Sequence, residues 1–116
     1  MGRRVDKPWG HEEVWAETDR YVGKLLSIRA GQRLSLQLHR RKDESIYVVR
    51  GVLRLTLENE HGELELSDLA PGESRRIPVG RRHRFEAIED CELMEVSTPE
   101  LDDVVRLEDD YGRADP

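Results

Sequence analysis

Short segments of alternating apolar and polar residues follow one another along most of this chain. Such alternation is typical of β-strands that bury one face. Clusters of turn-forming residues separate the segments, as at NEHG in residues 59–62 and at APGE in residues 70–73. The strands predicted in this way, which no convincing long helix interrupts, include YVGKLLSI, RLSLQLH, IYVV, VLRLTLE, ELELSDL, HRFEAIE and CELMEVS. Strands at this spacing favour an all-β sandwich or barrel over a parallel α/β sheet.

The ends of the chain are less regular than its middle. KPWG in residues 7–10 indicates an irregular lead-in, because proline lacks an amide donor and restricts the residue before it. Trp9 and Trp15 are expected to pack there. The acidic segment ELDDVVRLEDDYGR near the end fits either a helical turn or an extended arm. We expect one domain over residues 1–116, with an N-terminal arm at about 1–19 and a C-terminal tail at about 99–116.

Composition excludes several classes of partner. The chain is 38% charged with a formal net charge of −6, which argues against binding to nucleic acid or to acidic membranes. No apolar run approaches the roughly 20 residues of a membrane-spanning helix, and the first residues lack the apolar core of a signal peptide. A cytoplasmic protein is therefore expected. Cys91, the single cysteine, is expected to be a packed thiol.

Candidate chemistry is concentrated in residues 31–51, GQRLSLQLHRRKDESIYVVRG. Ser35, Gln37 and His39 share one face of the predicted strand, and Glu44 follows five residues after His39. A turn through the charged residues between them could return Glu44 to the same pocket. Gly51 ends the next strand, where a tight turn requires positive φ.

A second element with a fixed spacing follows later in the chain. The first element reads glycine, five residues, Gln37-x-His39, four residues, Glu44, six residues, glycine; the second reads glycine, five residues, Pro78-x-Gly80, two residues, His83. Together they resemble the two-motif pattern of the cupin superfamily. The resemblance implies a double-stranded β-helix, a jelly-roll-like barrel with the ligands of both motifs pointing inward. Two positions depart from the pattern: Gln37 replaces the first histidine of many cupins, and Ala87 replaces a common asparagine.

Three further segments narrow the resemblance. KPWG, GQRLSLQLH and VVRLEDDYGR resemble segments of type II mannose-6-phosphate isomerase domains. Those domains form the C-terminal part of bifunctional enzymes that also carry mannose-1-phosphate guanylyltransferase activity, so this chain resembles the cupin part standing alone. It departs from that family near the chemistry, where Lys42 takes an arginine position and Ser45 and Ile46 replace a His-Trp pair.

Gln37, His39, Glu44 and His83 are the predicted metal ligands. Two imidazoles, a carboxylate and an amide oxygen suit a divalent ion such as Zn, Mn, Fe, Co or Ni, with positions left open for water or substrate oxygens. One carboxylate against a dication leaves a net positive site that favours an enediolate, a carboxylate or paired sugar oxygens. The alternative is a metal-free barrel in which these residues only hydrogen-bond.

Three functions fit this site. The first is a mannose-6-phosphate isomerase-like enzyme that interconverts an aldose and a ketose, or their phosphates, by proton transfer. Lys24 is the candidate for a substrate-facing cation and Lys42 for an accessory one; alternatively, Lys24 is an edge lysine that reaches solvent. The second function is a non-catalytic metal-binding or sugar-binding cupin, and the third is a metal-dependent dioxygenase. The sequence singles out no general base.

A sugar-phosphate enzyme needs an anion anchor, and arginine is the preferred residue for it. Arg76, Arg50 and Lys24 are the candidates. Arg82 and Arg84 alternate away from His83, which predicts a solvated or dimer-contact position outside the barrel. The same alternation turns the leucines of GQRLSLQLH (Leu34, Leu36 and Leu38) outward. An exposed leucine row needs a cover, so a homodimer is predicted, with a partner's strands or its N-terminal arm over the row.

Overall fold

Two antiparallel sheets make up the fold. The structure, a computed structural model, describes residues 2–116, and within them every regular element is a β-strand. The first sheet has six strands in the order β1 (Arg3–Lys7), β2 (Gly10–Glu17), β3 (Val22–Ile28), β10 (Cys91–Ser97), β5 (Glu44–Arg50) and β8 (Ser74–Ile77). The second has five in the order β11 (Val105–Glu108), β4 (Leu36–Leu38), β9 (His83–Ala87), β6 (Leu53–Glu58) and β7 (Leu64–Leu69). The all-β prediction and the double-stranded β-helix implied by the cupin resemblance are confirmed.

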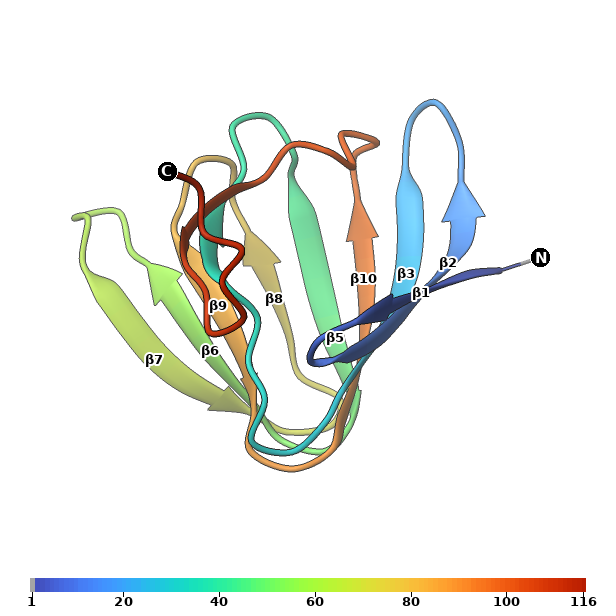
Figure 1. The fold of residues 1–116 in the computed structure, drawn as a ribbon, viewed down its shortest axis with the longest axis horizontal. Helices are drawn as coiled ribbons and strands as arrows, with labels where there is room; N and C mark the ends of the chain where they lie inside the picture. The colour runs from blue at the N-terminus through green and yellow to red at the C-terminus, as the bar shows by residue number, and fades with distance from the viewer. Residues whose placement is uncertain (1) are drawn as a thin grey trace.

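The core lies between the inner faces of the two sheets. In Figure 1 the sheets stand on either side of the molecule, with the β1–β2 hairpin at one side and the β6–β7 hairpin at the other. Alternate side chains along each strand point to the inner face. In β3 these are Val22, Lys24, Leu26 and Ile28, which are buried, whereas Leu25 and Ser27 are less covered. Cys91 is a buried free thiol, as predicted, and burial raises its pKa to about 11.

The turn at Gly51 has the predicted conformation. Gly51 has a φ of +82°, and a Cβ atom at this position would lie 2.1 Å from the backbone oxygen of Asp90. Only glycine fits there without displacing the backbone between β5 and β6.

The N-terminal segment is more regular than its sequence indicates. Lys7 ends β1 and Gly10 begins β2, so KPWG is a tight turn of a hairpin rather than an irregular lead-in. Trp9 is buried and joins the core, whereas Trp15 is 47% exposed and lies over Gly23 on the outer face of the sheet. The C-terminal segment takes the extended alternative, with β11 paired to β4.

The prediction that a row of leucines is exposed is wrong. Leu34 is 9% and Leu36 8% exposed within a single chain, and Leu34 belongs to the hydrophobic core. The reason is that regular strand geometry begins only at Leu36, after an isolated bridge at Arg33, so residues 34–36 are buried in succession instead of alternating. An exposed leucine row therefore no longer supports the homodimer. The homodimer stays a prediction, which light scattering of the purified chain would test.

Among the described residues, no helix has the length and apolar character needed to cross a membrane.

Candidate metal centre

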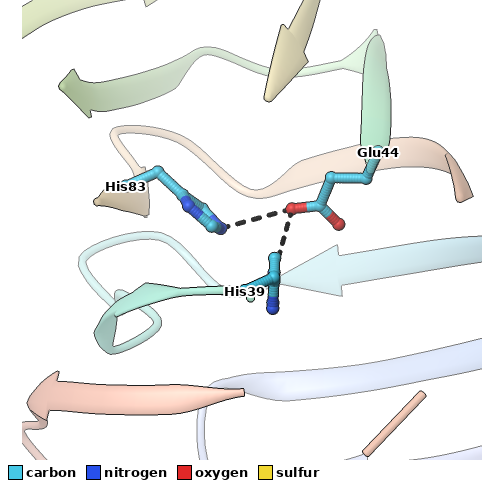
Figure 2. A group of neighbouring side chains, drawn as sticks. All are labelled: His39, Glu44 and His83. Carbon is cyan, nitrogen blue, oxygen red and sulfur yellow. Dashed lines mark ion pairs between the residues drawn. The ribbon is translucent and has the colours of Figure 1, made fainter. Parts of the chain in front are cut away.

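His39, Glu44 and His83 converge between the two sheets. His39 follows β4, Glu44 begins β5 and His83 begins β9, and their side chains point toward one another in Figure 2. The Oε1 atom of Glu44 lies 3.4 Å from Nε2 of His39 and 3.2 Å from Nε2 of His83. All three residues are buried, with exposures of 4%, 3% and 1%. The first and second motifs therefore meet at one point in space.

Backbone carbonyls fix the orientation of both imidazoles. Nδ1 of His39 lies 2.6 Å from the carbonyl oxygen of Asp103, and Nδ1 of His83 lies 3.0 Å from that of Arg81. A carbonyl can only accept, so each Nδ1 carries a proton and donates it. A neutral ring then presents an Nε2 lone pair to the centre of the cluster, which is the arrangement of metal-bound histidines supported by an outer shell.

The centre of this cluster lacks a donor. Nε2 of both histidines and Oε1 of Glu44 are buried without a hydrogen-bond partner among the described residues. Their ligand atoms lie within 4.8 Å of one another. Three lone pairs facing each other in a buried site repel unless a cation joins them or the imidazoles take up protons. The donor set therefore fits a divalent metal ion, bound by two nitrogens and a carboxylate oxygen.

Gln37 lies beside the cluster in the sheet. It is the cross-strand partner of His83, so their side chains share a face. Its Oε1 accepts a hydrogen bond of 2.7 Å from the hydroxyl of Ser35 and keeps a second lone pair.

Lys42 links Glu44 to a second buried carboxyl group. Its Nζ lies 3.2 Å from Oε2 of Glu44 and 3.3 Å from Oε2 of Glu95, and all three side chains are at least 93% buried. Burial opposes the charge of Lys42, but the carboxyl groups of Glu95 and Glu44 raise its pKa above the ordinary value. Burial also acts against ionised Glu44, yet His39, His83 and Lys42 hold its pKa well below the usual range. Lys42 thus fixes one carboxylate oxygen while the other faces the imidazoles.

Glu95 is a site residue that sequence reasoning missed. Burial and the charge of Glu44 raise its pKa to about 8, so it stays protonated at neutral pH. The signal was present in the alternation of CELMEVS, which puts Glu95 on the buried face with Cys91, Leu93 and Ser97. A carboxyl group on the buried face of a strand indicates that a buried polar or charged partner lies next to it.

Lys24 faces the interior of the barrel, as predicted from its strand face. It is 9% exposed, its cross-strand partner is Glu95, and its Nζ lies 3.5 Å from Oε1 of Glu12. The alternative of an edge lysine reaching solvent is wrong, because β3 lies inside the six-stranded sheet between β2 and β10.

Two of the three predicted anion anchors already have carboxylate partners at the surface. Arg76 and Arg50 are largely exposed and form ion pairs with Asp43 and Glu92, respectively, each at 2.9 Å. The solvated position predicted for Arg84 is wrong. Arg84 is 8% exposed and its guanidinium donates to the carbonyl oxygens of Leu34 and Glu108, because neighbouring chain covers the outer face of β9.

Asp103 holds the loop that connects two residues of the cluster. Its carboxylate accepts the backbone N–H groups of Arg40, Arg41 and Lys42 at 2.6–3.1 Å, and its own carbonyl accepts from His39. Against the effect of burial, these N–H groups lower the pKa of Asp103 to about 2. One residue of the C-terminal segment therefore fixes the loop that carries His39 toward Glu44. No local pattern in the sequence indicates this contact.

Replacing Asp103 with alanine is expected to weaken metal binding by about 10- to 100-fold, the usual effect of losing an outer-shell partner. The loop of residues 40–42 loses its acceptor, so the His39 ring is less well oriented. Metal titration by calorimetry measures the change. Asp102→Ala is the matched control, because Asp102 is adjacent and exposed. Equal metal affinity for Asp103→Ala and Asp102→Ala would contradict the assigned role.

The family relationship agrees with this geometry. A family model described as "Mannose-6-phosphate isomerase C-terminal" matches residues 1–109. The mannose-1-phosphate guanylyltransferase ManC of Salmonella typhimurium is 37% identical over 97% of this chain, and the xanthan biosynthesis protein XanB of Xanthomonas campestris is 35% identical over 96%. In each case the match covers 24% of the relative, so this chain spans about a quarter of their length.

Solved structures share the fold at lower sequence identity. KdgF from Halomonas superposes with a TM-score of 0.76 at 24% identity, covering 86% of this chain and 90% of KdgF. Oxalate decarboxylase of Bacillus subtilis superposes with a TM-score of 0.80 at 18% identity, covering 91% of this chain and 30% of the decarboxylase. With the matched family model and the motifs that meet between the sheets, these relationships show that the chain belongs to the mannose-6-phosphate isomerase C-terminal family and has the cupin fold.

Proposed function

We propose that this chain is a metal-dependent isomerase that interconverts an aldose phosphate and a ketose phosphate. The observation that carries the proposal is the buried cluster of His39, Glu44 and His83, whose facing Nε2 and Oε1 atoms have no hydrogen-bond donor, in a chain of this family. Membership of this family supports the proposal that the substrate is a small molecule. The cluster supports the proposal that a bound cation would contact the oxygens of that substrate.

In this proposal His39, His83 and Glu44 hold a divalent ion, with Gln37 as the fourth ligand. Such an ion would supply Lewis-acid chemistry beside the oxygens of a bound sugar. The carbonyl oxygens of Asp103 and Arg81 keep both histidines in the binding tautomer. The ammonium of Lys42 keeps the carboxylate of Glu44 aimed at the ion.

The remaining residues shape the surroundings of the reacting carbons. Glu95 and Lys24 present a protonated carboxyl group and a cation on the inner face of the six-stranded sheet, next to the proposed metal site. Isomerisation removes a proton from C2 of the aldose and returns a proton to C1, so a group within about 3 Å of that carbon must carry it. We retain Lys24 as the candidate for a substrate-facing cation and assign Lys42 to the orientation of Glu44.

Exchange of the C2 proton tests the proposal. Metal-loaded protein incubated with mannose 6-phosphate in deuterium oxide is expected to remove the C2–H signal from the proton NMR spectrum. The signal should persist with the His39→Ala/His83→Ala variant, which lacks both imidazoles. A panel of hexose and pentose phosphates extends the search for a substrate.

One observation favours a non-catalytic binding module instead. Glu44, Glu95, Lys42 and Lys24 all have charged or hydrogen-bonding partners within the chain, so a free general base is not apparent among the described residues. Sugar-phosphate binding by the metal-loaded protein without exchange for any member of the panel would support that function and contradict the isomerase.

A further inference from the structure

Three segments that are distant in sequence line one small cavity beside Gln37. The cavity has a volume of about 70 Å³. KPWG contributes two of its residues, β4 and the segment before it contribute three, and VVRLEDDYGR contributes two. They are Lys7, Trp9, Leu34, Ser35, Gln37, Arg106 and Arg113.

Positive charge predominates in this cavity. Within residues 2–116, Lys7 and Arg106 form no ion pair, and Nε of Arg106 is buried without a hydrogen-bond partner. Arg113 differs, because Asp109 binds its guanidinium at 2.9 Å through both carboxylate oxygens and so fixes its position. Three cations against the carboxylate of Asp109, and that of Asp115 on the backbone N–H of Arg106, leave the cavity net positive, so it favours an anion with several acceptor oxygens.

Strand register places this cavity beside the metal centre. Arg106 on β11 is the cross-strand partner of Gln37 on β4, and Gln37 is the partner of His83 on β9. Partners in antiparallel strands share a face, so the three side chains stand in a row. Two strand spacings separate Arg106 from His83, about 10 Å. That separation suits a sugar phosphate with its phosphoryl group at Arg106 and its carbonyl end at the histidines.

We propose that Lys7, Arg106 and Arg113 form the phosphoryl-binding subsite of this chain, with the Ser35 hydroxyl and the Gln37 amide at its inner wall. The subsite deepens the proposed isomerase function and rests on it for the identity of the sugar. It replaces Arg76 and Arg50 as anchor, because those arginines are exposed and already paired with carboxylates.

Calorimetric titration of the metal-loaded protein tests the subsite with inorganic phosphate, mannose 6-phosphate and mannose as probes. Arg106→Ala and Lys7→Ala are each expected to weaken binding of both phosphorylated probes by about tenfold or more, since each removes charge-assisted hydrogen bonds. Binding of mannose is expected to be unchanged. Arg75→Ala is the matched control for lost charge, because Arg75 is an exposed arginine on β8 without an ion pair among the described residues.

Binding and exchange together separate the subsite from the isomerase. Phosphate binding that depends on Arg106 without any C2 exchange supports the subsite and contradicts the isomerase. Arg106→Ala and Lys7→Ala could instead both keep the phosphate affinity of the wild type and continue to exchange the C2 proton. That result supports the isomerase and overturns the subsite. Metal content measured in each variant shows whether the metal centre is intact, so that a loss of phosphate binding can be assigned to the subsite itself.

Discussion

The His39→Ala/His83→Ala variant is expected to lose metal affinity by more than about a hundredfold. Loss of a single outer-shell partner already costs about 10- to 100-fold, and this change removes two ligands outright. Only Glu44 and Gln37 remain of the proposed set, and neither provides an imidazole for a borderline metal. Elemental analysis of the purified variant and competition titration with a chelator measure the loss.

The chain offers a histidine control for this experiment. His11 and His61 lie outside the cluster, with side chains 24% and 75% exposed, so His11→Ala/His61→Ala should bind metal like the wild type. Affinity of the wild type should also fall as pH is lowered, because protons compete for the two Nε2 atoms. The ligand assignment fails if the His39→Ala/His83→Ala protein still copurifies with stoichiometric metal.

Lys42→Met is expected to lower the free energy of unfolding by about 3–5 kcal/mol, the range for removing one partner from a buried ionic cluster. The ammonium of Lys42 is the shared partner of Glu44 and Glu95, and its side chain is 7% exposed. Methionine has a similar length but leaves the two carboxyl groups without a cation between them. Urea denaturation followed by tryptophan fluorescence measures the change.

Two further variants show whether the effect comes from the buried charges. Arg54→Met breaks an exposed pair with Asp68 and should leave stability close to that of the wild type. Adding Glu44→Gln to Lys42→Met should restore part of the loss, because a neutral amide then replaces the carboxylate that lost its cation, whereas Glu95 is already protonated at neutral pH. Equal stabilities of Lys42→Met and the wild type would contradict the role assigned to the cluster.

Features encoded by local pattern were predictable from the sequence. Alternation located the strands and placed Lys24 on the inner face, and the turn at Gly51 followed from the conformational freedom of glycine. The spacing of His39, Glu44 and His83 was informative because it resembles a two-motif pattern. The structure brings these three side chains together although His83 lies 39 residues beyond Glu44.

Features that depend on long-range packing were not predictable. The burial of Leu34 and Leu36 follows from an irregular entry into β4, and the burial of Arg84 follows from chain segments that cover the outer face of β9. Asp103 contacts the loop at residues 40–42 from about sixty positions away, which no local pattern encodes. The alternation of CELMEVS did place Glu95 on the buried face. The contact with Lys42 that explains a buried carboxyl group there comes from a distant part of the chain.

X-ray absorption spectroscopy of the metal-loaded protein is the most direct test of the metal centre. With zinc, the account predicts a first shell that contains two imidazole nitrogens at about 2.0–2.1 Å together with oxygen ligands. The His83→Ala variant should show one imidazole at most. A shell of oxygen ligands alone, or a spectrum that His83→Ala leaves unchanged, would contradict a metal ion held by His39, Glu44 and His83.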